Sequence, residues 1–208
     1  MSFSENFPDY FGDDAAPRWE AAGNAPLTAL PGLAEAPSEP TAEGSFEKHW
    51  LRTLAHVLTE EVQELYSAEK LLGEVLPMMA LASADPVLRA TCEVHLEHTS
   101  EHLRRLECVQ EILGLAADGR NCLTMEGLLI GLRETIEENR PGPSRDRALV
   151  EAARKIKHFE VAGYCGARDF AQLLGLAPVV EILQKTLDEE STLEAKFANL
   201  EELMVLRG

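Results

Sequence analysis

Four segments of the sequence place acidic or imidazole side chains among apolar residues that recur every three or four positions. An unpaired charge is costly to bury, so such residues on an inward helical face need a partner or a bound cation. Carboxylate oxygen and imidazole nitrogen together suit iron, manganese or zinc. The candidate metal ligands found in this way are Glu69, His95, His98, His102, Glu160 and Glu190.

The apolar spacing around these residues predicts helices throughout, and no segment alternates with the period of two that is typical of a strand. The first helix runs from Phe46, with a bend expected at Pro77, to a stop at Asp85-Pro86. The other helices are predicted from there to Gly114, around residues 125–136, from about 146 to 174, and from the turn at 175–178 through Leu200. Four long helices and a short one in the crossover predict an all-α, ferritin-like four-helix bundle.

The two helical hairpins of this bundle carry their polar groups at matching depths. Glu69 and His102 lie 16 and 17 residues on either side of the first turn. Glu160 and Glu190 lie 16 and 14 residues on either side of the second turn, which is centred on Leu176. Antiparallel packing then brings acids and imidazoles to one level, as a metal site in a bundle core requires.

Each of these residues also has a purely structural interpretation. A buried Glu69 could pair with a basic neighbour such as Lys70, Arg104 or Arg105, and a lone histidine is often an ordinary core residue. The Glu-x-x-His motif of ferritin-type di-iron proteins is absent, because no glutamate precedes the three histidines of the second helix by three positions. Only the predicted position of all these side chains at one depth in the bundle favours a metal site over this structural interpretation.

The first 45 residues differ in composition from the rest. They contain many prolines and acids and a single basic residue, Arg18, which predicts a disordered acidic tail at residues 1–45 and a helical bundle at residues 46–208. Apolar islands in the tail, such as Trp19 and the segment 27–33, could dock a protein partner.

Charge and hydropathy exclude several classes of partner. The chain has 36 acidic against 19 basic residues and a net charge of −17, which disfavours nucleic acid and anionic membranes. The most apolar stretch is too short to span a bilayer, and the acidic first residues do not form a secretory signal. These features predict a cytoplasmic protein, in which the four cysteines are buried hydrophobic residues instead of disulfides.

Several words of the sequence occur in series and resemble the YciE/YciF-type ferritin-like family of bacterial stress proteins. They are ELYSAEKLL (64–72), HLEHTSEHLRRLE (95–107), CLTMEGLL (122–129), ALVEAARKIKHFEVAGY (148–164) and EILQKTLDEE (181–190). The resemblance covers roughly residues 50–203 and implies a ferritin-like bundle, a homodimer and a dinuclear metal site.

By position, the resemblance adds His158 of the HFE word and Glu189 of the TLDEE word to the expected metal ligands. It assigns Glu126, in the crossover helix, either a role in supporting the ligands or a purely structural one. The second helix departs from the family pattern, since His98 and His102 stand where the family has Glu and Gln. Exchanging carboxylate for imidazole weakens the preference for ferric iron relative to zinc or ferrous iron, so the site is either retuned or has lost its di-iron chemistry.

Two functions follow as expectations. The first is a metal-binding protein, with iron as the expected ion and manganese or zinc as alternatives, acting in iron oxidation, peroxide consumption or sequestration during stress. In this scheme Glu69 and Glu160 bridge two ions, and Glu190 and the histidines are terminal ligands. The alternative is a non-catalytic structural or adaptor bundle whose tail recruits a partner.

Overall fold

Five helices make up the part of the chain that the computed structural model describes, residues 42–116 and 120–206. They are α1 (Ala42–Ala82), α2 (Pro86–Leu113), α3 (Leu123–Glu138), α4 (Pro143–Leu173) and α5 (Ala177–Leu206). No strand occurs within these ranges, so the all-α prediction is confirmed. The predicted tail lies outside the described residues up to residue 41, and α1 begins four residues before the expected boundary.

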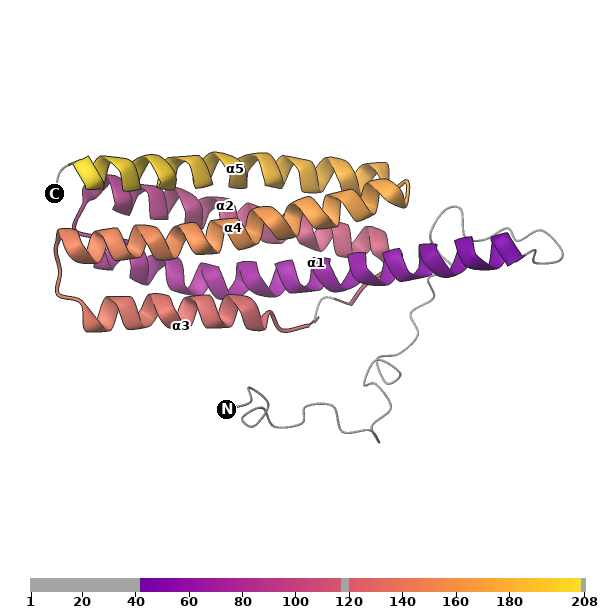
Figure 1. Ribbon diagram of the computed structural model, residues 1–208, viewed down its shortest axis with the longest axis horizontal. Helices are drawn as coiled ribbons and strands as arrows, with labels where there is room; N and C mark the ends of the chain where they lie inside the picture. Colours follow the sequence, from indigo (N-terminus) through magenta and orange to yellow (C-terminus); the bar gives the residue numbers. More distant parts are fainter. Residues whose placement is uncertain (1–41, 117–119, 207–208) are drawn as a thin grey trace, which may run out of the picture. The chain divides into compact units, whose positions relative to one another are not determined.

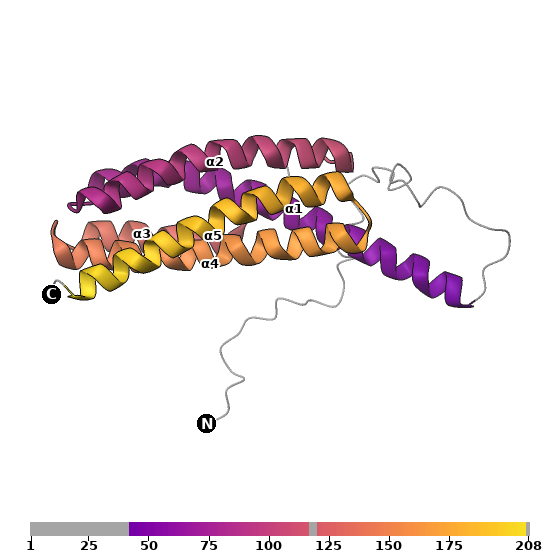
Figure 2. The ribbon, with the colours of Figure 1, turned by 90° about the horizontal axis from the view of Figure 1, so that it is seen from above.

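The four long helices lie side by side as two antiparallel hairpins, α1–α2 and α4–α5 (Figures 1 and 2). The short helix α3 belongs to the crossover between the hairpins and packs against α1 and α4. α1 also contacts α4, and α2 contacts α5, so the hairpins close into a bundle. Helix α1 continues through Pro77.

Local sequence signals explain where the two tight turns lie and where α2 ends. Asp85 caps α2, since its side chain accepts hydrogen bonds from the backbone N–H groups of Val87 and Leu88. Gly114 ends α2 with φ 68°, and Gly175 turns the chain between α4 and α5 with φ 71°, a left-handed conformation that favours glycine. These signals explain why the sequence located both turns.

The start of α4 is tied to the turn between α1 and α2. The N–H groups of Ala84 and Asp85 donate to the two carboxylate oxygens of Asp146, at 2.9 and 2.8 Å. The Arg145 guanidinium donates to the carbonyl of Ala82. These contacts set the position of α4 along the α1–α2 hairpin, and hence the depth at which its polar side chains meet those of α1 and α2.

Apolar side chains fill the bundle in two layers, one on each side of a polar level. The layer nearer the α1–α2 turn is the main hydrophobic cluster and includes Leu72, Met79, Leu88, Ile156 and Phe197. The layer toward the α4–α5 turn includes Leu58, Val62, Leu65, Val109, Ala171, Val179 and Leu183, all buried. Polar groups between such layers are shielded from water on both sides.

The described surface does not test the predicted partners. Trp50, Leu81 and Leu123 are among the large hydrophobic side chains exposed on it. No helix within the described ranges has an apolar stretch long enough to cross a membrane. The expected homodimer stays a prediction.

Replacing Asp146 with Ala tests the connection between α4 and the first turn. The variant leaves two backbone N–H groups without their acceptor, so we expect the free energy of unfolding to fall by about 1–3 kcal/mol in urea denaturation. Asp188→Ala is the control, because Asp188 is exposed and its side chain accepts a hydrogen bond from the Gln184 side chain on its own helix, not from the backbone of another element. Equal stabilities of the two variants would show that the connection contributes nothing.

Candidate metal centre

All four long helices contribute polar side chains to the level between the apolar layers. The titratable ones that are almost completely buried there are Glu69 from α1, His95 and His102 from α2, Lys157, Glu160 and Tyr164 from α4, and Glu190 from α5. Each has a relative exposure of 2% or less. Of the residues expected as ligands, the structure brings Glu69, His95, His102, Glu160 and Glu190 together at this level.

Gly163 lets α4 approach α1 beside this level. A Cβ atom at Gly163 would lie 2.9 Å from Leu65 Cδ2 and 3.0 Å from Glu61 Oε1, closer than side chains normally pack. The next residue, Tyr164, donates its hydroxyl to Glu69 Oε1 at 2.7 Å. The small residue thus brings a hydrogen-bond donor of α4 onto the carboxylate of α1.

His102 lies at the centre of the first half of the cluster. Its Nδ1 is 3.1 Å from both Glu69 Oε1 and Glu190 Oε1, and its Nε2 is 3.0 Å from Glu189 Oε2. Both ring nitrogens can donate only when the ring is protonated. His102 is therefore an imidazolium between carboxylates of α1 and α5.

Lys157 occupies the second half of the cluster. Its ammonium nitrogen contacts His95 Nε2 at 2.5 Å, Glu160 Oε2 at 2.6 Å and Glu190 Oε2. Glu190 thus joins the two halves, with one oxygen toward His102 and the other toward Lys157. Glu69 and Glu160 were expected to bridge two ions, whereas in the structure Glu190 is the carboxylate that lies between the two halves of the cluster.

A third group of possible ligands, more accessible to solvent, lies at the edge of the cluster. It consists of His98, His102 and Glu189, whose ligand atoms lie within 4.8 Å of one another. Arg105, however, donates to both oxygens of Glu189, at 2.7 and 2.9 Å. Because this bidentate pair already satisfies the carboxylate, Glu189 is a weaker candidate ligand than the buried glutamates.

The pKa values follow from burial opposed by these contacts. Burial disfavours the charged form of His102, but hydrogen bonds to Glu190 and Glu69 and the charges of both carboxylates outweigh it and raise the pKa to about 10. Burial likewise disfavours the Lys157 ammonium, but the charges of Glu160 and Glu190 outweigh it and raise its pKa. Both side chains are therefore cationic at neutral pH.

The pKa values of the remaining groups depend on whether burial or the neighbouring charges have the larger effect. Burial and then the charge of Glu190 raise the pKa of Glu160 well above its usual value, so it binds a proton readily. Burial opposes ionisation of Glu190, but Lys157 and His102 lower its pKa. Burial, then Lys157, lowers the pKa of His95, which is neutral. Two cations among three carboxylates leave the cluster with one negative charge, or none when Glu160 is protonated.

Two residues implied by the family resemblance lie elsewhere. The side chain of His158 is 62% exposed and pairs with Glu194 at 3.1 Å on the bundle surface, because it is one position away from the inward-facing Lys157. Glu126 lies half-buried in the first turn of α3. The structure brings neither into the cluster.

Sequence reasoning missed Lys157 and Tyr164. Lys157 precedes Glu160 by three positions and Tyr164 follows it by four, so all three share one helical face. That spacing was a usable signal. A lysine is rarely buried, however, so the spacing alone did not mark Lys157 as a buried member of the cluster.

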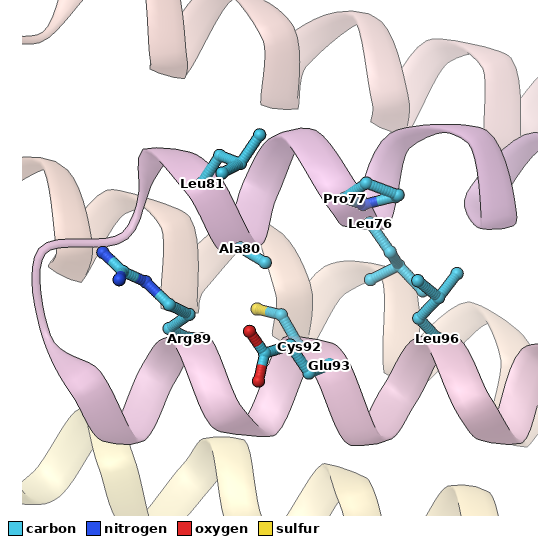
Figure 3. Close-up of a pocket in the computed structure, with 8 residues that line it drawn as sticks. All are labelled: Leu76, Pro77, Ala80, Leu81, Arg89, Cys92, Glu93 and Leu96. Atoms are coloured by element: carbon cyan, nitrogen blue, oxygen red, sulfur yellow. The ribbon is translucent and has the colours of Figure 1, made fainter.

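A mainly apolar hollow between α1 and α2 is separate from the cluster (Figure 3). Pro77, Leu81, Cys92 and Leu96 are among its lining residues. Burial, followed by the charge of Glu93, raises the pKa of the Cys92 thiol to about 12. The thiol is thus protonated and unreactive at neutral pH, and this hollow offers no nucleophile.

Four long helices with one long crossover, carboxylates from both hairpins and imidazoles from the first hairpin at mid-height, define a ferritin-like bundle. Residues 53–207 match the family described as a domain of unknown function, DUF892. The chain belongs to this family.

Relatives of known sequence and structure agree. Protein YciF of Escherichia coli K12 is 32% identical over 151 residues, which cover 72% of this chain and 91% of YciF. The crystal structure of this E. coli stress protein superposes with a TM-score of 0.71 at 31% identity, over 74% of this chain and 98% of that one. YcfI of Rhodopseudomonas palustris, described as a proposed structural protein, gives a TM-score of 0.67 at 29% identity, over 70% and 92% of the two chains.

The pKa of His102 predicts how the metal-free protein responds to alkali. The folded pKa of about 10 exceeds the ordinary value of 6.5, so the stability due to this charge is complete below pH 6.5 and is lost as pH rises through 10. With chelator present, the free energy of unfolding should fall across this window with a slope approaching about 1.4 kcal/mol per pH unit. Denaturant titrations at a series of pH values measure it.

His102→Gln should remove this slope, whereas His158→Gln, at an exposed imidazole of the same type, should retain it. Parallel profiles for the wild type and His102→Gln would contradict the assignment of an imidazolium.

Proposed function

We propose that this protein binds a divalent transition-metal ion between Glu69, His102 and Glu190, and serves metal handling, of iron first, during stress. One observation carries the proposal: these ligand atoms come from three helices, are completely buried and lie within 4.8 Å of one another. Two carboxylates and one imidazole suit Fe²⁺, Mn²⁺ or Zn²⁺.

A buried carboxylate oxygen at the site that accepts no hydrogen bond supports metal binding. Among the described residues, Glu69 Oε2 is buried and has no hydrogen-bond partner, although Glu69 Oε1 accepts from Tyr164 and contacts His102. A buried carboxylate oxygen without a donor is costly and fits a cation. Binding requires the proton on His102 Nδ1 to leave, so that a ligand nitrogen replaces an imidazolium.

The protein would contribute ligands, orientation and exclusion of water. Tyr164 would hold Glu69 through its hydrogen bond, and Glu189 would orient the His102 ring through Nε2, as residues that contact metal ligands commonly do. A redox-active ion bound here would supply one-electron chemistry. The apolar layers on both sides limit access of water, which favours retention of an ion over rapid turnover.

A second candidate function is a structural bundle that needs no metal. Lys157 and His102 together neutralise most of the buried negative charge, and the related YcfI is described as a proposed structural protein. On this alternative, a chelator leaves the melting temperature unchanged and added Zn²⁺, Mn²⁺ or Fe²⁺ does not raise it. The predicted recruitment of a partner belongs to residues 1–45, which are mostly outside the described ranges.

Titration calorimetry of chelator-treated protein with Zn²⁺ and Mn²⁺, and with Fe²⁺ under anaerobic conditions, tests the metal site. We expect Glu69→Gln and His102→Ala to weaken binding by more than the about 10- to 100-fold typical of removing a residue that only supports a ligand. Saturating metal should also raise the melting temperature of the wild type.

His158→Ala is the matched control, because it deletes an exposed imidazole outside the cluster and should bind as the wild type does. Metal binding that survives Glu69→Gln and His102→Ala but is lost in His158→Ala would place the ion on the surface. Absence of binding in the wild type would favour the structural alternative.

A further inference from the structure

The buried cluster contains two adjacent positions for a cation, and a side chain fills one of them. The first lies between Glu69, His102 and Glu190, and the second between His95, Glu160 and Glu190. Each has three ligand atoms within 4.8 Å of one another. Glu190 belongs to both, since its oxygens face opposite halves of the cluster.

The second position holds the ammonium of Lys157. This nitrogen contacts all three members of the group, His95 Nε2 at 2.5 Å, Glu160 Oε2 at 2.6 Å and Glu190 Oε2. The side chain is completely buried and reaches Glu160 one turn along its own helix. An ion at this position would have to displace an ammonium already in contact with the same ligand atoms.

We infer that Lys157 is a built-in cation that takes the place of a second metal ion and restricts this centre to a single ion. The inference rests on the proposed metal site for the first position. A dinuclear centre does not fit these residues, because two divalent ions beside a buried ammonium would place too much positive charge among three carboxylates. Lys157 thereby determines the nuclearity of the site without being a ligand.

Restriction to a single ion limits the reactions that this centre can support. Reactions that need two electrons from a pair of adjacent ions are unavailable to a centre with one ion. The structure accordingly favours binding and retention of an ion over the oxidation of ion pairs.

Lys157→Glu tests this inference, because it removes the ammonium and adds a carboxylate at the second position. Lys155→Glu is the matched control, with the same change of charge two residues away on the same helix, at a side chain that is 62% exposed and pairs with Glu151. Lys157→Met removes the charge at similar length and serves if Lys157→Glu does not fold. Stoichiometry is measured by calorimetry and elemental analysis with Zn²⁺, and Mn²⁺ electron paramagnetic resonance distinguishes an isolated ion from a coupled pair.

We expect one ion per chain in the wild type and Lys155→Glu, and two in Lys157→Glu or Lys157→Met, with a coupled Mn²⁺ spectrum only in the latter two. One ion in all variants would overturn the inference and leave the proposed function intact, and two ions in the wild type would overturn the inference alone. If the wild type binds none but a Lys157 variant binds one, the proposed function fails, and the restriction to a single ion, which rests on it, fails with it. No binding by any variant refutes both.

Discussion

Neutralising three buried carboxylates is the constraint on which the middle of this molecule depends. Glu69, Glu160 and Glu190 lie between two apolar layers, where an unpaired charge would cost several kcal/mol. Lys157 and His102 meet this requirement with side-chain cations from α4 and α2. Since every long helix contributes a member, the charge balance also fixes how deep each helix lies against its neighbours, and the Asp146 contacts at the first turn set the same depth from outside.

The two cations differ in what can replace them. His102 holds a proton that a metal ion can displace, since the same nitrogen is an acceptor when neutral. Lys157 has no acceptor to offer, and its ammonium remains between His95, Glu160 and Glu190. The cluster therefore nearly balances its own charge without a metal, and the proposed ion would enter at the half that contains His102. Structural and metal-binding roles need not exclude each other in this chain.

Similarity to its relatives does not establish what the buried cluster of this chain does. The chain shares its bundle with the E. coli stress protein YciF and with YcfI, which is described as a proposed structural protein. A shared fold does not by itself establish a shared site, because function depends on the few side chains that the fold brings together. In this chain the decisive side chains are the imidazole of His102, which is both cation and potential ligand, and the ammonium of Lys157, which is only a cation.

The sequence by itself determined the helices, both turns and the depth of the cluster. Apolar spacing, Asp85-Pro86 and the glycines at 114 and 175 are local signals, and counting residues from each turn placed Glu69 level with His102 and Glu160 level with Glu190. Only the tertiary structure decided which atoms meet. It directed His158 to the surface, placed Lys157 inside and made Glu190 the shared carboxylate, since these outcomes depend on the rotation of each helix about its axis. Turning a helix about its axis by the angle between two successive residues moves an inward-facing side chain outward. The packing of neighbouring helices fixes that angle.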